Sequence, residues 1–118
     1  MPLSEITGTE TVTSTEWSLV TDTSYAESDG STDDGVVQLY LDLDDMVAGD
    51  ELQIRFYEDT RSGDTQRTME EWSFFGDQPY PGQPFPHFTV MHQWDFTAKV
   101  IAGTSIIVTW SIRRIPVA

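Results

Sequence analysis

The chain has 118 residues and no cysteine, so it is long enough for one domain with its own core, and disulfides, thiolate metal sites and cysteine nucleophiles are excluded. Its 20 acidic residues outnumber 6 basic ones, for a formal net charge of −14, which argues against direct contact with nucleic acid or an anionic membrane. No apolar run approaches the ~20 residues of a membrane span, and the start of the chain lacks the basic and apolar regions of a signal peptide.

The first half of the sequence alternates between striped segments and polar turns. Residues 1–8 are expected to form an N-terminal tail, and residues 9–21, rich in Thr, Val and Trp, predict a strand. Residues 24–36 are polar and contain two Asp-Gly pairs, so they predict an exposed loop. Apolar and polar residues alternate over 35–43 and again over 50–58, which predicts two strands that each bury one face.

The second half contains one segment of unusual composition. A strand predicted over 66–76 is followed by Asp77–Phe88, which holds four prolines and three aromatic residues. Proline fixes φ and donates no backbone hydrogen bond, so this segment is expected to be a stiff, extended arm outside the sheets. Residues 87–103 predict one long or two short strands, and residues 105–114 predict a last strand that forms a hairpin with the preceding one.

These segments predict an all-β fold with a single domain over residues 1–118. No stretch shows sustained helical periodicity, and evenly spaced strands with one apolar face are typical of an antiparallel β-sandwich. We expect six to eight strands, in a jelly-roll or immunoglobulin-like arrangement, with the proline-rich arm of residues 77–88 attached. The predicted core contains Trp94, Trp110, Leu39, Leu41, Ile54 and Phe56.

Few residues of the chain have the spacing of a catalytic or metal site. The two histidines, His87 and His92, do not have the spacing of a zinc site. Neighbouring acids such as Glu70 and Glu71 point to opposite faces of a strand, so they do not form a catalytic pair. We therefore expect no enzyme, no catalytic residue, no metal site and no cofactor. One alternative is a calcium site in the acidic loop 27–35, because calcium prefers several oxygen ligands.

The tryptophans raise a second alternative, a carbohydrate-binding module, because such modules often present aromatic platforms. All four tryptophans, however, lie within alternating apolar stripes: Trp17, Trp72, Trp94 and Trp110. Packing in the core is the simpler interpretation for each of them.

Three stretches resemble a group of small structural proteins in the virions of tailed bacteriophages. They are GTETVTSTEWSLVTDTS, LYLDLDDMVAGDELQIRFYEDTRSGDTQR and HQWDFTAKVIAGTSIIVTWSIRRI, and the resemblance spans Gly8 to Arg114. It implies a structural protein of the head or neck without catalytic residues. We expect a decoration (cement) protein, made in the host cytoplasm, that lies on the outer surface of the capsid, binds the major capsid protein and self-associates as a dimer or trimer. A tail or neck protein, or a calcium- or carbohydrate-binding sandwich, are the alternatives.

In this interpretation the proline-rich arm is the contact with the partner. A stiff segment loses little conformational entropy on docking, and aromatic rings make strong anchors. The predicted interface residues are Tyr80, Phe85, His87 and Phe88. The alternative is that the arm folds back and covers the protein's own core.

Overall fold

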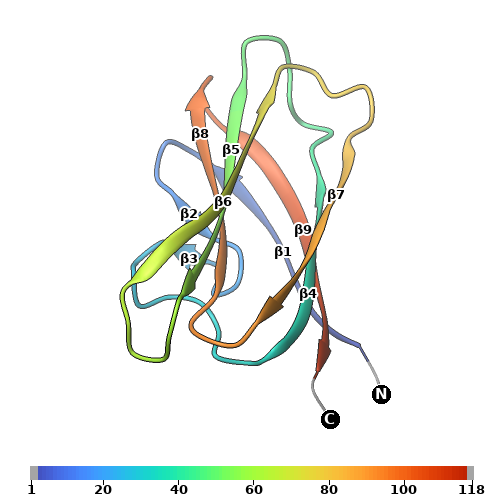
Figure 1. Cartoon of the computed structure of the whole chain (residues 1–118). Helices are drawn as coiled ribbons and strands as arrows, with labels where there is room; N and C mark the ends of the chain where they lie inside the picture. The colour runs from blue at the N-terminus through green and yellow to red at the C-terminus, as the bar shows by residue number, and fades with distance from the viewer. Residues whose placement is uncertain (1–2, 117–118) are drawn as a thin grey trace.

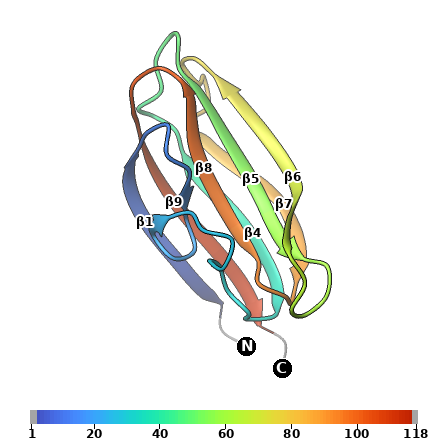
Figure 2. The same ribbon diagram turned by 90° about the vertical axis from the view of Figure 1, so that its left-hand side faces the viewer.

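The computed structural model describes residues 3–116 as two antiparallel β-sheets packed face to face (Figures 1 and 2). Within this range there is no helix, and so none that could cross a membrane. The strands are β1 (Ser4–Val12), β2 (Trp17–Ser18), β3 (Thr23–Ser24), β4 (Gly35–Asp42), β5 (Glu51–Asp59), β6 (Gln66–Phe75), β7 (Gly82–Val90), β8 (Asp95–Ala102) and β9 (Ile106–Pro116).

The strand order is that of a jelly roll. One sheet, here called sheet A, has the order β1-β9-β4-β7, and the other, sheet B, has the order β3-β2-β8-β5-β6. Without β3, a two-residue strand that pairs antiparallel with β2 at the margin of sheet B, this is the double-sheet jelly-roll arrangement of eight strands. The predicted β-sandwich is confirmed. The count of nine slightly exceeds the expected six to eight, because β2 and β3 are two-residue pieces.

The core lies between the sheets and follows the alternation of the sequence. Trp94 and Trp110 are 0% and 2% exposed, as expected, and join a single cluster with the other predicted core residues, Leu39, Leu41, Ile54 and Phe56. The Trp110 indole packs directly on Gly8 of β1, where an added Cβ would come within 2.3 Å of the ring. The core therefore requires a residue without a side chain at position 8.

The predicted proline-rich arm is largely an edge strand. Gly82–Val90 forms β7, which pairs with β4 at the margin of sheet A, so the expectation that residues 77–88 stay outside the sheets is wrong from Gly82 onward. An edge strand has a free side, on which a missing N–H costs nothing. The register shifts between Gln38 and Tyr40, and there the Gln38 side-chain amide donates a 2.6 Å hydrogen bond to the Phe85 carbonyl oxygen. The prolines thus determined the strand's position at the edge.

The structure also corrects the predictions for the N-terminal tail, for the strand over residues 9–21 and for the last hairpin. Residues 4–8 belong to β1, which pairs with β9 over its whole length, so they are no tail; residues 1–2 lie outside the described part. The strand expected over 9–21 is split, because β1 ends at Val12 and β2 begins at Trp17. The predicted hairpin of the last two strands is wrong, since β8 pairs with β2 and β5 while β9 pairs with β1 and β4.

Candidate protein-interaction site

The four residues predicted to contact a partner do not lie together. Tyr80 is 80% exposed in the connection between β6 and β7, and His87 is exposed on the outer face of sheet A. Phe85 is only 4% exposed and belongs to the core, and the half-buried Phe88 stacks on Phe56 with ring centroids 4.3 Å apart. The prediction that Phe85 and Phe88 dock on a neighbour is therefore wrong, whereas Tyr80 and His87 remain available.

The buried rings of β7 cover the protein's own core. Phe85 makes edge-to-face contacts with Trp72 and Phe74 of β6, at centroid distances of 4.8 and 5.9 Å, and Phe88 lies 6.0 Å from Trp72. These strands are the edges of opposite sheets, so their aromatic side chains close the open side of the sandwich. Such contacts add stability beyond the burial of area alone.

The β4–β5 and β6–β7 connections lie at the end of the molecule opposite the termini, at the top in Figure 1, and exposed apolar residues occur in and beside them. Tyr80, Phe75 and Val47, which we call the apolar tip, are 80%, 67% and 60% exposed and rank among the four most exposed large apolar residues of the described chain. Val47 and Tyr80 lie on the β4–β5 and β6–β7 connections, and Phe75 is the last residue of β6. The two connections adjoin, because the Gly76 amide donates to the Asp50 carbonyl oxygen at 2.8 Å. A second link runs from the Leu43 amide to the Pro81 carbonyl oxygen at 2.9 Å.

Side-chain hydrogen bonds hold the tip in shape. The Gln78 amide donates to the carbonyl oxygens of Phe75 and Gly76, both at 3.1 Å. The Gln83 amide donates to the Tyr80 carbonyl oxygen at 2.8 Å, and a similar bond at 3.0 Å joins the Val47 amide to the Asp50 carboxylate. Because these bonds already fix the backbone of the tip, little conformational entropy would be lost when a partner binds it.

Sequence reasoning found one tip residue and missed two. Tyr80 stood out through its proline neighbours. Phe75 had a signal, since it lies on the face of its strand opposite Trp72 and Phe74, which the structure turns toward the core. Val47 had none, because a single valine in a turn has no alternating neighbours that would define its face.

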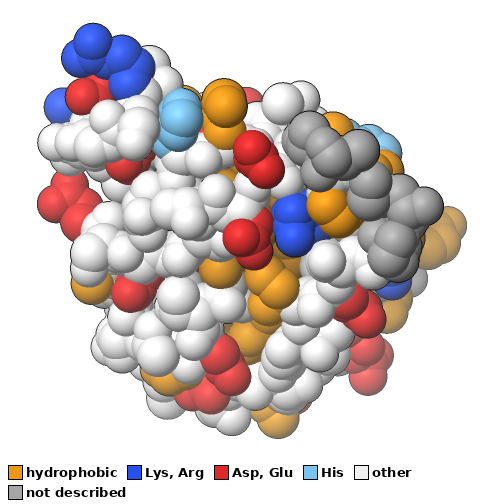
Figure 3. Space-filling view, turned by 90° about the horizontal axis from the view of Figure 1, so that it is seen from below, with side chains coloured by type: hydrophobic (Ala, Val, Ile, Leu, Met, Phe, Trp, Pro, Cys, Tyr) orange, Lys and Arg blue, Asp and Glu red, His pale blue; other side chains and the backbone are white. Residues whose placement is uncertain are grey.

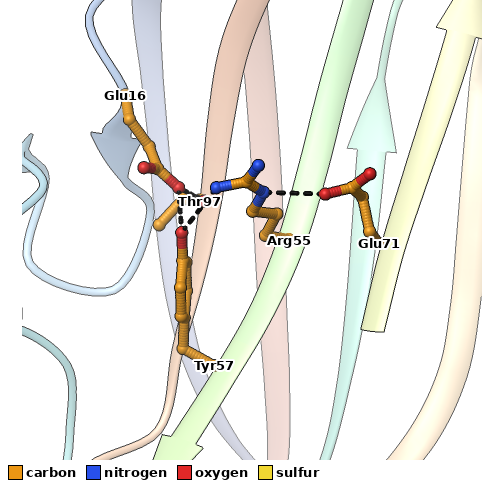
Figure 4. Close-up of polar contacts among 5 residues, drawn as sticks. All are labelled: Glu16, Arg55, Tyr57, Glu71 and Thr97. Atoms are coloured by element: carbon orange, nitrogen blue, oxygen red, sulfur yellow. Dashed lines mark hydrogen bonds and ion pairs between the residues drawn. The ribbon is translucent and has the colours of Figure 1, made fainter. Parts of the chain in front are cut away.

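A polar cluster on the outer face of sheet B joins five side chains by hydrogen bonds (Figure 4). The Glu16 carboxylate accepts hydrogen bonds from the Tyr57 hydroxyl at 2.7 Å and the Thr97 hydroxyl at 2.5 Å. Arg55 donates to the Tyr57 oxygen at 3.2 Å and to the Glu71 carboxylate at 2.8 Å. Burial raises the pKa of Tyr57, and the hydrogen bond to Tyr57 raises that of Arg55. These side chains satisfy one another's hydrogen-bonding groups, so the cluster acts as a structural clamp.

This clamp continues into a latch segment, residues 19–31, which includes the edge strand β3 of sheet B. Tyr25 stacks on Tyr57 with centroids 4.7 Å apart, and its hydroxyl donates to Gln66 at 2.5 Å. Gln66 in turn donates from its amide to the carbonyl oxygens of Asp29 and Gln93, at 3.1 and 2.7 Å. Much of the predicted exposed loop is therefore tied to the sandwich by side chains.

Asp95 is a buried carboxyl group at the base of the latch. The Ser18 hydroxyl donates to its Oδ1 at 2.9 Å, while Oδ2 has no hydrogen-bond partner. Burial raises the pKa of Asp95 to about 7, against the opposing effect of the hydrogen bond from Ser18. The group is thus poised to change its charge near neutral pH.

The described residues form neither a calcium site nor an exposed aromatic platform for sugar binding. Within residues 3–116 no three His, Cys, Asp or Glu side chains gather as metal ligands. In the acidic loop 27–35, Asp29 instead accepts a hydrogen bond from the Ala26 amide at 2.8 Å. For sugar binding, Trp94 and Trp110 are buried and the two other tryptophans, Trp17 and Trp72, pack against the core, so they form no exposed platform.

A second apolar surface lies at the end where the termini emerge. A groove of about 340 Å³ there is lined by Val36, Val90, Met91 and Ile115, among others. Figure 3 views the molecule from this end and shows hydrophobic side chains between acidic ones. The sandwich therefore exposes apolar surface at both ends.

No protein-family model matches the chain, and a search of curated proteins finds no significant match. Solved structures share its fold at low sequence identity. A protein from Bacillus endospore appendages, described as a novel family of disulfide-linked pili, is 14% identical over 99% of this chain and 88% of that chain, with a TM-score of 0.61. PirA is 9% identical over 94% and 95%, with a TM-score of 0.52. The Yersinia pseudotuberculosis-derived mitogen is 10% identical over 99% and 89%, with a TM-score of 0.49. The protein from endospore appendages and PirA thus share the fold of this chain.

Proposed function

We propose that the chain is a non-enzymatic structural protein that attaches to another protein through the apolar tip. The observation that supports this most strongly is the exposure of Val47, Phe75 and Tyr80 at one end of a sandwich whose other aromatic rings are largely packed. Clustered apolar residues on a soluble protein mark interaction sites, and a central aromatic anchor typically contributes about 2 kcal/mol or more.

The partner's surface should combine an apolar pocket with basic residues. The chain carries a formal net charge of −14, and Asp77 is exposed in the same connection as Tyr80. Opposite charges around an apolar contact guide association and exclude wrong partners. Lys and Arg around the pocket are therefore what the tip would recognise.

The specific form we propose is a decoration protein that binds the major capsid protein on the outside of a phage head. The resemblance to small virion proteins and the compact jelly roll support this proposal. A tail or neck position is the second candidate, supported by the same resemblance. By analogy of fold alone, the likeness to a protein of endospore pili also suits a subunit of an assembly. With no cysteine, any assembly of this chain is held without disulfides.

Carbodiimide crosslinking in purified particles tests this proposal, because it joins carboxylates to nearby lysines without a spacer. We expect crosslinks from Asp77, beside the tip, to lysines of the major capsid protein. Crosslinks from Asp77 to a tail-tube or neck subunit would instead support the second candidate. Crosslinks that arise only from the opposite end, for example from Glu5, would overturn the role of the tip.

A further inference from the structure

We propose that two copies of the chain pair through the outer face of sheet A, related by a two-fold axis. The proposal concerns a surface separate from the apolar tip and does not depend on the partner that the tip binds. It rests on a symmetry in the side chains that β9 presents to solvent. These are Ile107, Thr109, Ser111, Arg113 and Ile115.

The pattern on β9 is apolar at both ends and polar between them. Ile107 and Ile115 are 46% and 50% exposed, and each lies four residues from Ser111. A two-fold axis that crosses the strands at Ser111 would place Ile107 of one copy against Ile115 of the second copy, twice. Exposed isoleucines on a sheet face would thus be covered in pairs. Such an isologous contact is the commonest form of self-association.

The same axis pairs opposite charges. Arg113 lies over the Tyr40 ring, 3.9 Å from its centroid, and the ion pairs formed among residues 3–116 leave it without a carboxylate partner. At the other end of the face, a pocket of about 260 Å³ is lined by Asp42, Asp44 and Asp45 together with Ile107 and Thr109. Since Asp42 is level with Thr109, the axis brings Arg113 of one copy to the acidic pocket of the other.

The centre of the face is flat enough for close approach. Next to β9, the outward residues of β1 at the centre are threonines, and the Thr9 and Thr109 hydroxyls are hydrogen-bonded at 3.1 Å, while Glu5 lies opposite Arg113 near the end of the strand. Stacked sheets pack about 10 Å apart face to face. A second copy of this face offers an acidic pocket to Arg113 and an arginine to the acidic pocket, so it fits the face better than a uniformly basic partner does.

The size of the face indicates a weak dimer. Four strands about 4.8 Å apart, with about nine residues of about 3.3 Å each, present roughly 570 Å² per copy. The total of roughly 1,100 Å² lies just below the range of about 1,200–2,000 Å² for standard interfaces, so we expect a reversible dimer in the micromolar range. In this arrangement the two apolar tips point in opposite directions. The dimer would be a two-ended bridge, whose attachment gains from avidity.

Sedimentation velocity from low micromolar to several hundred micromolar protein tests the dimer. The wild-type chain should shift to twice its mass, whereas Arg113→Asp and Asp42→Arg should each stay monomeric because they place like charges together. An equimolar mixture of these two variants should recover the dimer, since both contacts of the mixed pair are then complementary. If Asp42→Arg melts early, Asp44→Arg, in the same pocket, takes its place.

Arg61→Asp is the matched control, because Arg61 is highly exposed in the β5–β6 turn, away from this face. It changes the net charge as Arg113→Asp does and should leave dimerisation at the wild-type level. A wild-type chain that stays monomeric at several hundred micromolar overturns the proposal. So does equal loss of dimer in Arg61→Asp, or a mixture that stays monomeric. Because the readout is mass alone, these results are independent of whether the tip binds a capsid.

Discussion

The carboxyl group of Asp95 lies where the latch segment meets sheet B, fully buried and with one oxygen unpartnered. Its pKa is raised from 3.8 to about 7 by burial, so the folded state holds a proton that the unfolded state releases between these values. Stability from this group is therefore fully present below about pH 4 and declines as pH rises toward 7. A shift of this size corresponds to at most about 4 kcal/mol.

Replacing Asp95 by Asn should remove this dependence, because the amide has nearly the same shape and does not ionise. We expect Asp95→Asn to be more stable than the wild type at pH 8, by about 1–4 kcal/mol, with a much smaller advantage at pH 4. Urea unfolding of both proteins at the two pH values measures this. The other carboxylates affect both proteins alike, so an advantage that is the same at pH 4 and pH 8 would show that Asp95 is not the titrating group.

Among the elements, β7 separates a core role from a surface role most clearly. Phe85 is buried against Trp72 and Phe74, so Phe85→Ala should lower the free energy of unfolding by about 3–5 kcal/mol. Tyr80 lies only five residues earlier and is highly exposed, so Tyr80→Ala should lower the free energy of unfolding by less than about 0.5 kcal/mol. Denaturant unfolding of the isolated chain measures both. Equal effects of the two substitutions would contradict the placement of β7 in the sheet.

The sequence predicted which face of each strand is buried better than it predicted which strands pair. Alternation in β4, β5 and β9 predicted which residues are buried, including Trp110, since burial follows a period of two. Alternation carries no information on pairing, so the hairpin expected at the C-terminus and the tail expected at residues 4–8 were wrong. Proline indicated an exposed segment, but a free sheet edge satisfies the same restriction as an arm. The strands β2 and β3 have two residues each, which is too short for any periodicity.

The candidate site was only partly predictable for the same reason. Tyr80 could be identified from its composition-biased neighbourhood, whereas its association with Phe75 and Val47 depends on two connections that meet in space. The charge pattern on sheet A likewise arises from strands far apart in the sequence, as the pairing of Asp42 with Thr109 shows. Patterns along one strand are visible in the sequence, but patterns across strands require the topology.

The whole molecule is an acidic sandwich about 43 Å long, and we propose different surfaces for different contacts. The apolar tip would hold the partner, and the outer face of sheet A would hold a second copy. Each added point of attachment raises the effective concentration of the next, so a chain with both surfaces can bridge neighbouring subunits. In this proposal the chain binds the assembled shell and does not bind free capsid subunits, so its binding stabilises the assembly by mass action.

The attachment of purified chain to particles that lack it tests the tip most directly. We compare the wild type with Phe75→Ser combined with Tyr80→Ala, and use Ile101→Ser, an equally apolar exposed site on β8, as the control. The tip variant should stay folded and bind at least ~30-fold more weakly, since the loss of even one aromatic anchor costs about 2 kcal/mol, while the control binds as the wild type does. Wild-type affinity in the tip variant would contradict the proposed attachment.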